Sequence, residues 1–555
     1  MHRGLPNGVN EMRGIRPAFS VALVLCLGTI ALMAQQPVPQ TFIDCIAASG
    51  SGSTCQLSPG AYSVTSKLVI GRSNITVTGT MSAGPADTVL VRGTSSLSSI
   101  MSDFSVSTTG TAASGSTTLG VASANGISGG QLVTGPGIAA GTTVAAVSGT
   151  TITLSAAVTT TLSSTPVTFA TTGVTVSYLT FDGNRYNFGI QGSGISCLTD
   201  QLSKIDLDLS SGGNFTAEWL DFVNSPDTAV HLSGLSTLSY SNLGMGTSSG
   251  IGPNGLTGPE DGPQTATRFT AVYLSGGSSA AQSPGSAAYY NSVYYAGTAG
   301  ITLDGYDQIV YGNWLFNNRY EMSDGSGGGQ LTLWPGPFGT AALASVAGNV
   351  INGNNWDGGQ STETLCPITG PLQSNSGVEA NGTGHRFYNN ELYENSGGGM
   401  VVNLGDPTAQ ILVSSTNPWY SGDTPRYIEA NGYGGITFYG SSRGWSPIQG
   451  VSLDDVLIAN NAIYGVYFDN VQNYGSYLGF VQNGSCMWGN EVNGSEADVS
   501  WPNGPNQGNT QPAPNTPTYL YPSSTSLYQG GPCPSQPAGQ ATPAPSGLPP
   551  SQWKW

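Results

Sequence analysis

Charged and aromatic side chains that could do chemistry follow two corners of a repeated sequence pattern. They are Arg319, Tyr320, Glu321, Asp324, Trp356 and Asp357. Two neighbouring carboxylates can act as the acid and the base or nucleophile of glycoside hydrolysis, and the same oxygens can hold Ca²⁺. Arg319 could neutralise a substrate carboxylate, and Trp356 could stack on a sugar ring. The set predicts a catalytic site, whereas the simpler alternative is a surface ion pair with Asp residues at turns.

A second candidate group combines Glu379 with His385 on adjacent expected strands. Histidine is the side chain that most readily exchanges a proton near neutral pH, so both residues are catalytic candidates. The alternative is that His385, at the start of a strand, is only a structural hydrogen-bonding residue. His231 lies in an apolar strand, and we expect it to be buried.

Further residues are candidates for substrate contacts. Arg185 lies in an Asn-Arg-Tyr step that is repeated at Arg319 and Tyr320, so Arg185, Tyr320 and Trp356 are grouped as substrate-binding residues. Asp304 and Asp307 join this group because they flank a short turn sequence, Asp-Gly-Tyr-Asp, although Asp-Gly is also an ordinary turn.

The elements that must position these residues are short strands in a repeated unit. The pattern appears in residues 308–318, 344–355 and 385–395. Each copy has an alternating apolar run, then Gly-Asn or Asn-Asn, a second apolar run and another Asn-rich corner. Alternation with period two predicts strands, and Asn and Gly tolerate the left-handed backbone of tight turns. Three short strands per unit, repeated without helices, indicate a solenoid.

This pattern resembles the right-handed parallel β-helix of the pectate-lyase-like superfamily, from Thr41 to about Pro502. The resemblance implies an all-β solenoid with coils stacked at ~4.8 Å, ladders of Asn side chains at the corners and reactive groups on the outer face of one sheet. As part of this likeness, Asp304 and Asp307 resemble the paired aspartates of β-helix hydrolases. The resemblance also implies that Arg319 could be the base, as in lyases of this superfamily. The catalytic motifs of polygalacturonases and pectate lyases are not found, so the resemblance implies a fold and not a function.

Composition divides the chain into five segments. Arg13 and Arg16 precede the apolar run 18–33, a pattern typical of a secretory signal peptide, and a membrane anchor is the alternative. Residues 106–170 are Thr- and Ala-rich with almost no charge. The expected segments are a signal peptide (1–34), an N-terminal cap with the first coils (35–105), a small inserted β module (106–170), the parallel β-helix (171–502) and a Pro-, Ser- and Gln-rich low-complexity tail (503–555).

Charge and cysteine usage indicate the partners and the compartment. The formal net charge is −17, and no basic face that would suit nucleic acid is apparent. The same charge disfavours polyanionic ligands and favours neutral glycans. Export permits disulfides, and Cys45 with Cys55 is the best candidate pair. No cofactor is required by the sequence, and Ca²⁺ is the one candidate.

These observations together predict an exported carbohydrate-active protein, secreted or on the cell surface, whose partner is a polysaccharide. If it is an enzyme, we expect a glycoside hydrolase or a polysaccharide lyase. The alternative is a non-catalytic surface protein that binds glycans or supports structure. We expect no stable membrane insertion after removal of the signal peptide.

Overall fold

The computed structural model describes most of the first half of the chain and the strands of the second half. The described residues are 35–48, 50–80, 87–184, 204–244, 270–276, 285–294, 296, 299–316, 318, 328–333, 344–347, 349–352, 375–381, 385–393, 395, 398–403, 411–414, 427–429, 431, 434–439, 451–454, 457–459, 464–469, 481–483, 486–488 and 497–500.

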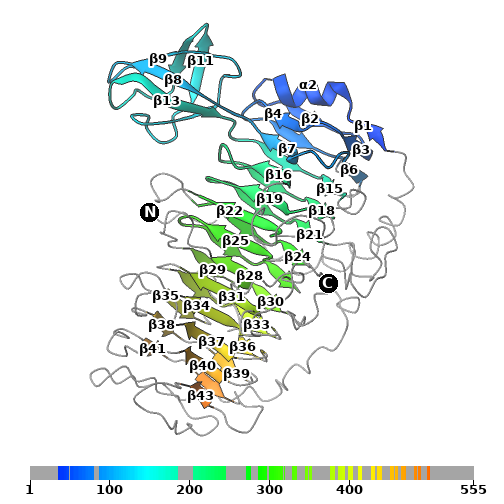
Figure 1. Ribbon diagram of the computed structural model, residues 1–555, viewed down its shortest axis with the longest axis vertical. Helices are drawn as coiled ribbons and strands as arrows, with labels where there is room; N and C mark the ends of the chain where they lie inside the picture. The colour runs from blue at the N-terminus through cyan, green and yellow to red at the C-terminus, as the bar shows by residue number, and fades with distance from the viewer. Residues whose placement is uncertain are drawn as a thin grey trace.

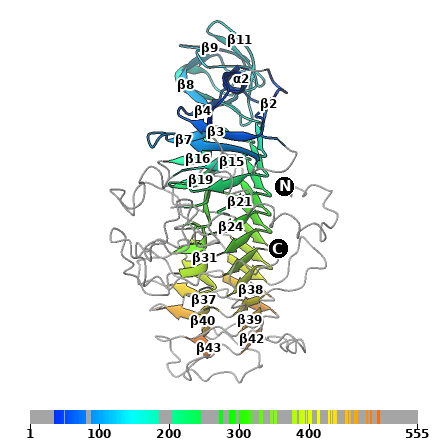
Figure 2. The same cartoon turned by 90° about the vertical axis from the view of Figure 1, so that its right-hand side faces the viewer.

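The chain folds as an all-β, right-handed parallel β-helix with a small inserted β module, as the sequence predicts (Figure 1). Each coil gives one strand in turn to three long parallel sheets, here called A, B and C, which run side by side along the solenoid (Figure 2). The stacking of coils explains the short strands, because every coil must turn three corners.

The strands of sheet A, in order, are β1 (Gln36–Pro37), β3 (Gly60–Val64), β6 (Thr88–Arg92), β15 (Thr180–Asp182), β18 (Asp221–Val223), β21 (Asn242–Leu243), β24 (Ser292–Tyr294), β27 (Trp314–Phe316), β30 (Val350–Asn352), β33 (Glu391–Tyr393), β36 (Tyr427–Glu429), β39 (Leu457–Ala459) and β42 (Cys486–Trp488). Those of sheet B are β2 (Thr54–Gln56), β5 (Thr76–Thr78), β14 (Thr175–Ser177), β17 (Thr216–Glu218), β20 (Thr237–Ser239), β23 (Ala287–Tyr289), β26 (Ile309–Tyr311), β29 (Ser345–Ala347), β32 (Arg386–Tyr388), β35 (Ile411–Ser414), β38 (Val451–Asp454) and β41 (Val481–Asn483).

Sheet C carries the candidate site described below. Its strands are β4 (Leu68–Ile70), β7 (Ser99–Asp103), β16 (Ile205–Leu209), β19 (Thr228–Leu232), β22 (Val272–Ser275), β25 (Ile301–Asp304), β28 (Gly328–Leu333), β31 (Asn375–Asn381), β34 (Met400–Asn403), β37 (Gly434–Tyr439), β40 (Tyr464–Asp469) and β43 (Ala497–Ser500).

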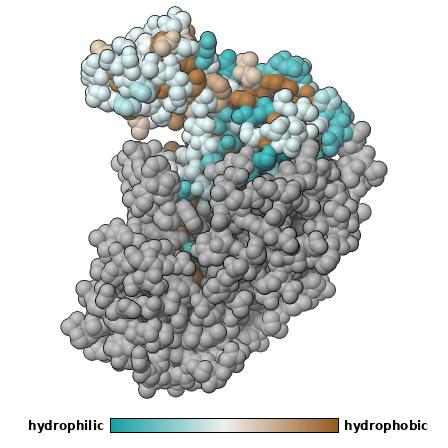
Figure 3. Space-filling view, in the orientation of Figure 1, coloured by the Kyte–Doolittle hydropathy of each residue, from teal (hydrophilic) through white to brown (hydrophobic). Residues whose placement is uncertain are grey.

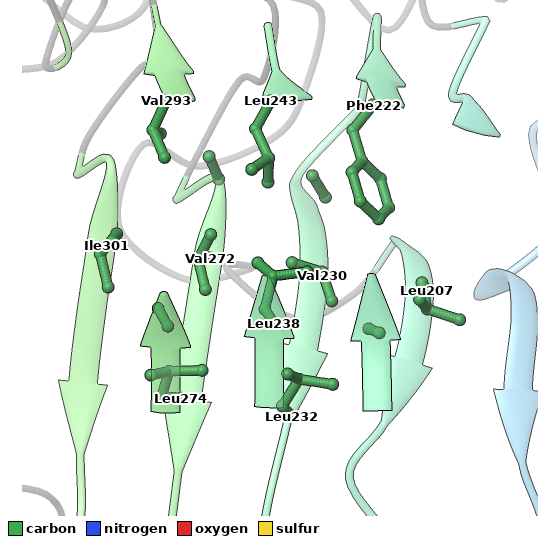
Figure 4. Packing of buried hydrophobic residues seen from close by; sticks show 14 of the residues in the cluster. Leu207, Phe222, Val230, Leu232, Leu238, Leu243, Val272, Leu274, Val293 and Ile301 are labelled. Atoms are coloured by element: carbon green, nitrogen blue, oxygen red, sulfur yellow. The ribbon is translucent and has the colours of Figure 1, made fainter. Parts of the chain in front are cut away.

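The core consists of columns of apolar side chains that repeat from coil to coil. In sheet C, Val230 is in register with Leu207 on one side and Val272 on the other, and all three are fully buried (Figure 4). A second sheet C column contains Leu232 and Leu274. Burial of each such side chain contributes ~1.5–3 kcal/mol. Because alternate residues point to opposite faces, the columns fix which residues of sheet C face outward.

Ladders of amide side chains line two corners, as the resemblance implies. Between sheets B and A, the side chain of Asn313 donates to Asn349 Oδ1 at 3.0 Å, and Asn349 donates to Asn390 Oδ1 at 2.9 Å. Asn291 donates to Asn313 in the same way at 2.9 Å. The second ladder, between sheets A and C, contains Asn318, Gln330, Asn395 and Asn431. Each ladder ties consecutive coils together and satisfies buried backbone groups.

A helix closes the N-terminal end of the solenoid. The helix α2 (Gln40–Ala48) buries Phe42 and Ile46 against the first coil. A disulfide joins Cys45 in this helix to Cys55 in β2, which confirms the predicted pair. The helix is the cap that the end of a stacked solenoid needs. Within the described part of the chain, no helix has the length and apolar character needed to cross a membrane.

The inserted module is a separate antiparallel sheet that projects from the upper end of the solenoid (Figure 1). It contains β8 (Ser105–Ala112), β9 (Thr118–Val121), β10 (Leu132–Thr134), β11 (Val144–Ser148), β12 (Thr151–Leu154) and β13 (Leu162–Ala170). The module has its own core around Leu119, Ile152 and Phe169. The chain enters it after β7 of sheet C. In the space-filling view, most of the module's visible surface has intermediate hydropathy (Figure 3).

Candidate functional site

The candidate site lies on the outer face of sheet C, where polar side chains from adjacent coils meet. In β19, Val230 and Leu232 point into the core, so His231 between them points outward. In register with His231 are Asp208 of β16 and Tyr273 of β22. The next outward position holds Ser275 in β22, in register with Asp304 of β25. These five residues are called the sheet C cluster.

His231 is the centre of the sheet C cluster. Its Nε2 atom lies 2.7 Å from Ser275 Oγ, and its Nδ1 atom lies 3.5 Å from Asp208 Oδ1. The Tyr273 ring meets the imidazole edge-on, with 5.1 Å between the ring centroids. Both nitrogens therefore have partners, and the adjacent aromatic ring restricts rotation of the imidazole.

Each end of the cluster is held by a further hydrogen bond. The hydroxyl of Tyr273 donates to Asp304 Oδ2 at 2.7 Å, and the hydroxyl of Ser210 donates to Asp208 Oδ1 at 2.6 Å. The orientation of both carboxylates is thus fixed by neighbouring residues of the solenoid. Rigid strands with such supporting contacts hold reactive groups more accurately than loops do.

The surroundings shift the two carboxyl groups in opposite directions. Burial raises the pKa of Asp208, but the hydrogen bond and charge of His231, together with Ser210 and Lys67, outweigh it, so the net shift is downward. Burial raises the pKa of Asp304, and the opposing effects of Tyr273 and His231 do not reverse it. Asp208 is therefore held as the anion, which suits a carboxylate that orients a histidine.

The sheet C cluster is partly accessible to solvent. The side chain of His231 is 11% exposed and that of Asp208 is 28% exposed. Tyr273, Ser275 and Asp304 are also half-buried. A ligand on the outer face of sheet C can therefore reach these groups, while their hydrogen bonds are formed in a partly desolvated environment.

The sequence-predicted residues fall into three groups. Asp304 belongs to the sheet C cluster, whereas Asp307 is exposed at a corner with a left-handed backbone (φ 55°). Glu379 is buried on the outer row of sheet C, farther along the solenoid. His385 is buried before a sheet B strand, and its Nδ1 accepts the backbone N–H of Ala344 at 3.3 Å. Outside the described residues lie Arg185, Arg319, Tyr320, Glu321, Asp324, Trp356 and Asp357.

Sequence reasoning missed four members of the cluster, namely Asp208, His231, Tyr273 and Ser275. His231 is buried, as predicted, with 9% of its surface exposed, but it faces outward and not into the core. The signal was the alternation around His231 and around Asp208, which places both side chains on the face opposite the leucines. The register between coils could not be predicted from the sequence, because Ser275 contacts a histidine that is 44 residues away along the chain.

No arrangement of three or more His, Cys, Asp or Glu side chains suited to a metal ion occurs among the described residues. The carboxylates for which the sequence suggests Ca²⁺, Glu321, Asp324 and Asp357, lie outside that part of the chain. Ca²⁺ binding by them stays a prediction.

A second surface feature is a stack of aromatic rings at the corner between sheets B and A. The rings of Tyr178, Trp219, Tyr240 and Tyr290 follow one another with centroid distances of 6.4, 4.9 and 5.5 Å and nearly parallel planes. Trp219 and Tyr240 are each 40% exposed. Because the rings cover one another's faces, the stack offers mainly edges to solvent. Its geometry suits the stabilisation of the corner better than stacking against a sugar.

Comparison with known proteins found distant structural matches alone. No family model matches the chain, and no curated protein matches it. Similar solved structures include the A-module of the Azotobacter vinelandii mannuronan C-5 epimerase AlgE4 (14% identity, TM-score 0.40, 84% of this chain and 98% of that chain covered). Others are the catalytic unit of a GH87 α-1,3-glucanase from Streptomyces thermodiastaticus (11%, 0.41, 85% and 64%) and the Gp54 tailspike of the Acinetobacter baumannii bacteriophage AP22 (10%, 0.35, 86% and 75%). At these identities and TM-scores, the matches carry no argument about activity.

Proposed function

We propose that this chain is an exported carbohydrate-active protein that binds a polysaccharide across the outer face of sheet C and breaks a bond in it. The observation that carries the proposal is the placement of His231 between Asp208 and Ser275. A histidine oriented by a carboxylate and bonded to a hydroxyl is the arrangement used for general acid–base catalysis. His231 is therefore the proposed proton-transferring group.

The ligand class follows from the shape and charge of the surface. Sheet C repeats outward-facing positions at a strand spacing of ~4.8 Å, which suits an extended, repetitive ligand. The net charge of −17 and the carboxylates Asp208 and Asp304 disfavour a polyanion. A neutral polysaccharide is the proposed substrate class.

The spacing of the two carboxylates bears on the kind of bond that is broken. Asp208 and Asp304 lie three strand spacings apart in sheet C, and Asp304 is also two residues along its strand from the position in register with Asp208, so ~16 Å separates their backbones. Inverting glycosidases place their carboxyl groups ~6.5–9.5 Å apart and retaining ones closer. Within the described residues, this pair is therefore poorly placed for direct glycoside hydrolysis. Glu321, Asp324 and Asp357 stay the candidates for a glycosidase, and Arg319 stays the candidate base of a lyase.

A screen of the purified chain tests the proposal. Neutral and acidic polysaccharides are incubated with and without Ca²⁺, and reducing ends, unsaturated products and released acyl groups are measured in parallel. We expect turnover of a neutral polysaccharide, which His231→Gln abolishes while binding of the same polysaccharide persists. Binding without any turnover would support the non-catalytic alternative, and turnover that His231→Gln leaves unchanged would contradict the placement of the site on sheet C.

A further inference from the structure

We propose that Ser275, His231 and Asp208 form a nucleophilic triad that hydrolyses acyl esters on the hydroxyl groups of a neutral polysaccharide. The inference rests on the proposed function for the polysaccharide and deepens it by naming the bond. It stands on the geometry of three side chains from three consecutive strands of sheet C, β16, β19 and β22.

The contacts have the order that serine activation needs. Asp208 lies at the Nδ1 side of His231, which favours the tautomer with the proton on Nδ1. Nε2 is then an acceptor, and Ser275 Oγ, 2.7 Å away, donates its proton to it. A carboxylate, an imidazole and a hydroxyl linked in this order define a catalytic triad by their roles, whatever the fold that carries them.

The neighbouring serines show that this contact is particular to Ser275. Ser233, in the corner that follows β19, donates to the backbone carbonyl of Ser210 at 2.6 Å, and Ser210 donates to Asp208 at 2.6 Å. Ser275 also lies 3.4 Å from the carbonyl of Leu232, but its shorter contact is with the imidazole. The carbonyl of Leu232 is thus within reach of the Ser275 hydroxyl, and the hydroxyl nevertheless makes its short contact with His231.

Tyr273 and Asp304 complete the support of the triad. The Tyr273 ring packs edge-on against His231 and its hydroxyl is directed to Asp304. The phenol therefore positions the imidazole without competing with Ser275 for Nε2. Tyr273 is a positioning residue for the triad.

The reaction proceeds in two balanced steps. Ser275 Oγ attacks the ester carbonyl carbon while its proton passes to His231 Nε2. The bond between the carbonyl carbon and the sugar oxygen then breaks, and His231 returns the proton to the leaving sugar hydroxyl, which leaves an acyl-serine. A water molecule attacks this acyl group, His231 takes a proton from the water, and the carboxylic acid departs as Ser275 regains its proton. The co-reactant is water alone.

The substrate class agrees with the charge of the site. Ester hydrolysis needs no carboxylate on the sugar. Binding of a polyuronate would instead bring anionic sugars beside Asp208 and Asp304, in a chain of net charge −17 that repels them. An O-acylated neutral polysaccharide is therefore the expected substrate.

The experiment measures acetate released from O-acetylated xylan and, separately, hydrolysis of p-nitrophenyl acetate by the purified full chain. We expect both activities in the wild type and a loss of ~10³-fold or more in Ser275→Ala. Ser233→Ala is the matched control, since it removes a hydroxyl from the corner of the neighbouring strand without touching His231, and it should retain full activity. Melting temperatures of both variants show that they are folded.

The outcomes separate the two proposals. Acetate release from xylan that depends on Ser275 supports both. Hydrolysis of p-nitrophenyl acetate that depends on Ser275, without acetate release from the xylan and without turnover in the polysaccharide screen, supports the triad and contradicts the proposed polysaccharide substrate. Cleavage of a polysaccharide backbone without ester hydrolysis, or ester hydrolysis that Ser275→Ala leaves unchanged, overturns the triad.

Discussion

The corner between sheets B and A and the outer face of sheet C use the same coil repeat in different ways. At the corner, Asn313 and Asn349 are fully buried and bond to each other and to backbone carbonyls. On sheet C, His231 and Ser275 bond to each other and stay partly accessible. One set of contacts joins the coils, and the other holds reactive groups.

The difference teaches how a solenoid separates stability from chemistry. A side chain that completes buried backbone hydrogen bonds is costly to remove, because its buried partners are then left without a hydrogen bond and cannot reach water. A side chain whose partners are other side chains at the solvent-facing surface of a sheet can be changed at a smaller cost in stability. The two regions therefore predict opposite responses to substitution.

The largest expected effect is on activity, from Asp208→Asn. An amide can donate to Nδ1 of His231, which favours the tautomer with the proton on Nε2 and prevents Nε2 from accepting the proton of Ser275. We expect kcat to fall by about 10²–10⁴-fold, measured with p-nitrophenyl acetate, while the melting temperature changes little. A variant with wild-type kcat would break the assignment of Asp208.

The next effect is on stability, from Asn313→Ala. Asn313 donates to Asn349 and to the carbonyl of Ala288, and its own Oδ1 accepts from Asn291. Leaving these buried groups without partners should lower the free energy of unfolding by ~2–4 kcal/mol. Calorimetry measures the loss, and the kcat of the remaining folded protein should be unchanged. Unaltered stability would contradict the structural role of the ladder.

A smaller effect, which depends on pH, is expected from Asp221→Asn. Burial raises the pKa of Asp221 to about 6, against a smaller opposing effect of the Asn242 amide. A carboxyl whose pKa is raised in the folded state favours folding below its unfolded pKa, and this contribution is lost as the pH rises through about 6. The variant should therefore gain roughly 1–3 kcal/mol over the wild type at pH 8 and little at pH 4. Thermal unfolding at both values measures the difference, and an equal effect at both would contradict it.

The smallest effect is expected from Tyr273→Phe, which sharpens the distinction between positioning and catalysis. The substitution keeps the ring beside His231 and removes the hydrogen bond to Asp304. We expect kcat/KM to fall by less than ~10-fold, because one hydrogen bond contributes ~1 kcal/mol. A loss as large as that of Asp208→Asn would show that the phenol itself takes part in the reaction.

The fold was predictable from the sequence because it depends on a local, repeated pattern. The alternation of apolar residues and the Asn corners at Asn313, Asn349 and Asn390 repeat in every copy, and the disulfide joins cysteines close in sequence. The sheet C cluster depends instead on register between coils of unequal length. Asp208, His231 and Ser275 come from separate coils, and only Asp304 of the cluster could be singled out from its own surroundings.

Labelling with a fluorophosphonate tests the central claim most directly, because such reagents phosphonylate a serine, with loss of fluoride, only when a base activates the hydroxyl. The full chain and His231→Gln are treated under the same conditions, and the modified residue is located by peptide mass spectrometry. We predict one adduct, on Ser275, in the wild type and none in the variant. An unlabelled wild type, or a label on Ser275 that persists without His231, would contradict the triad on sheet C.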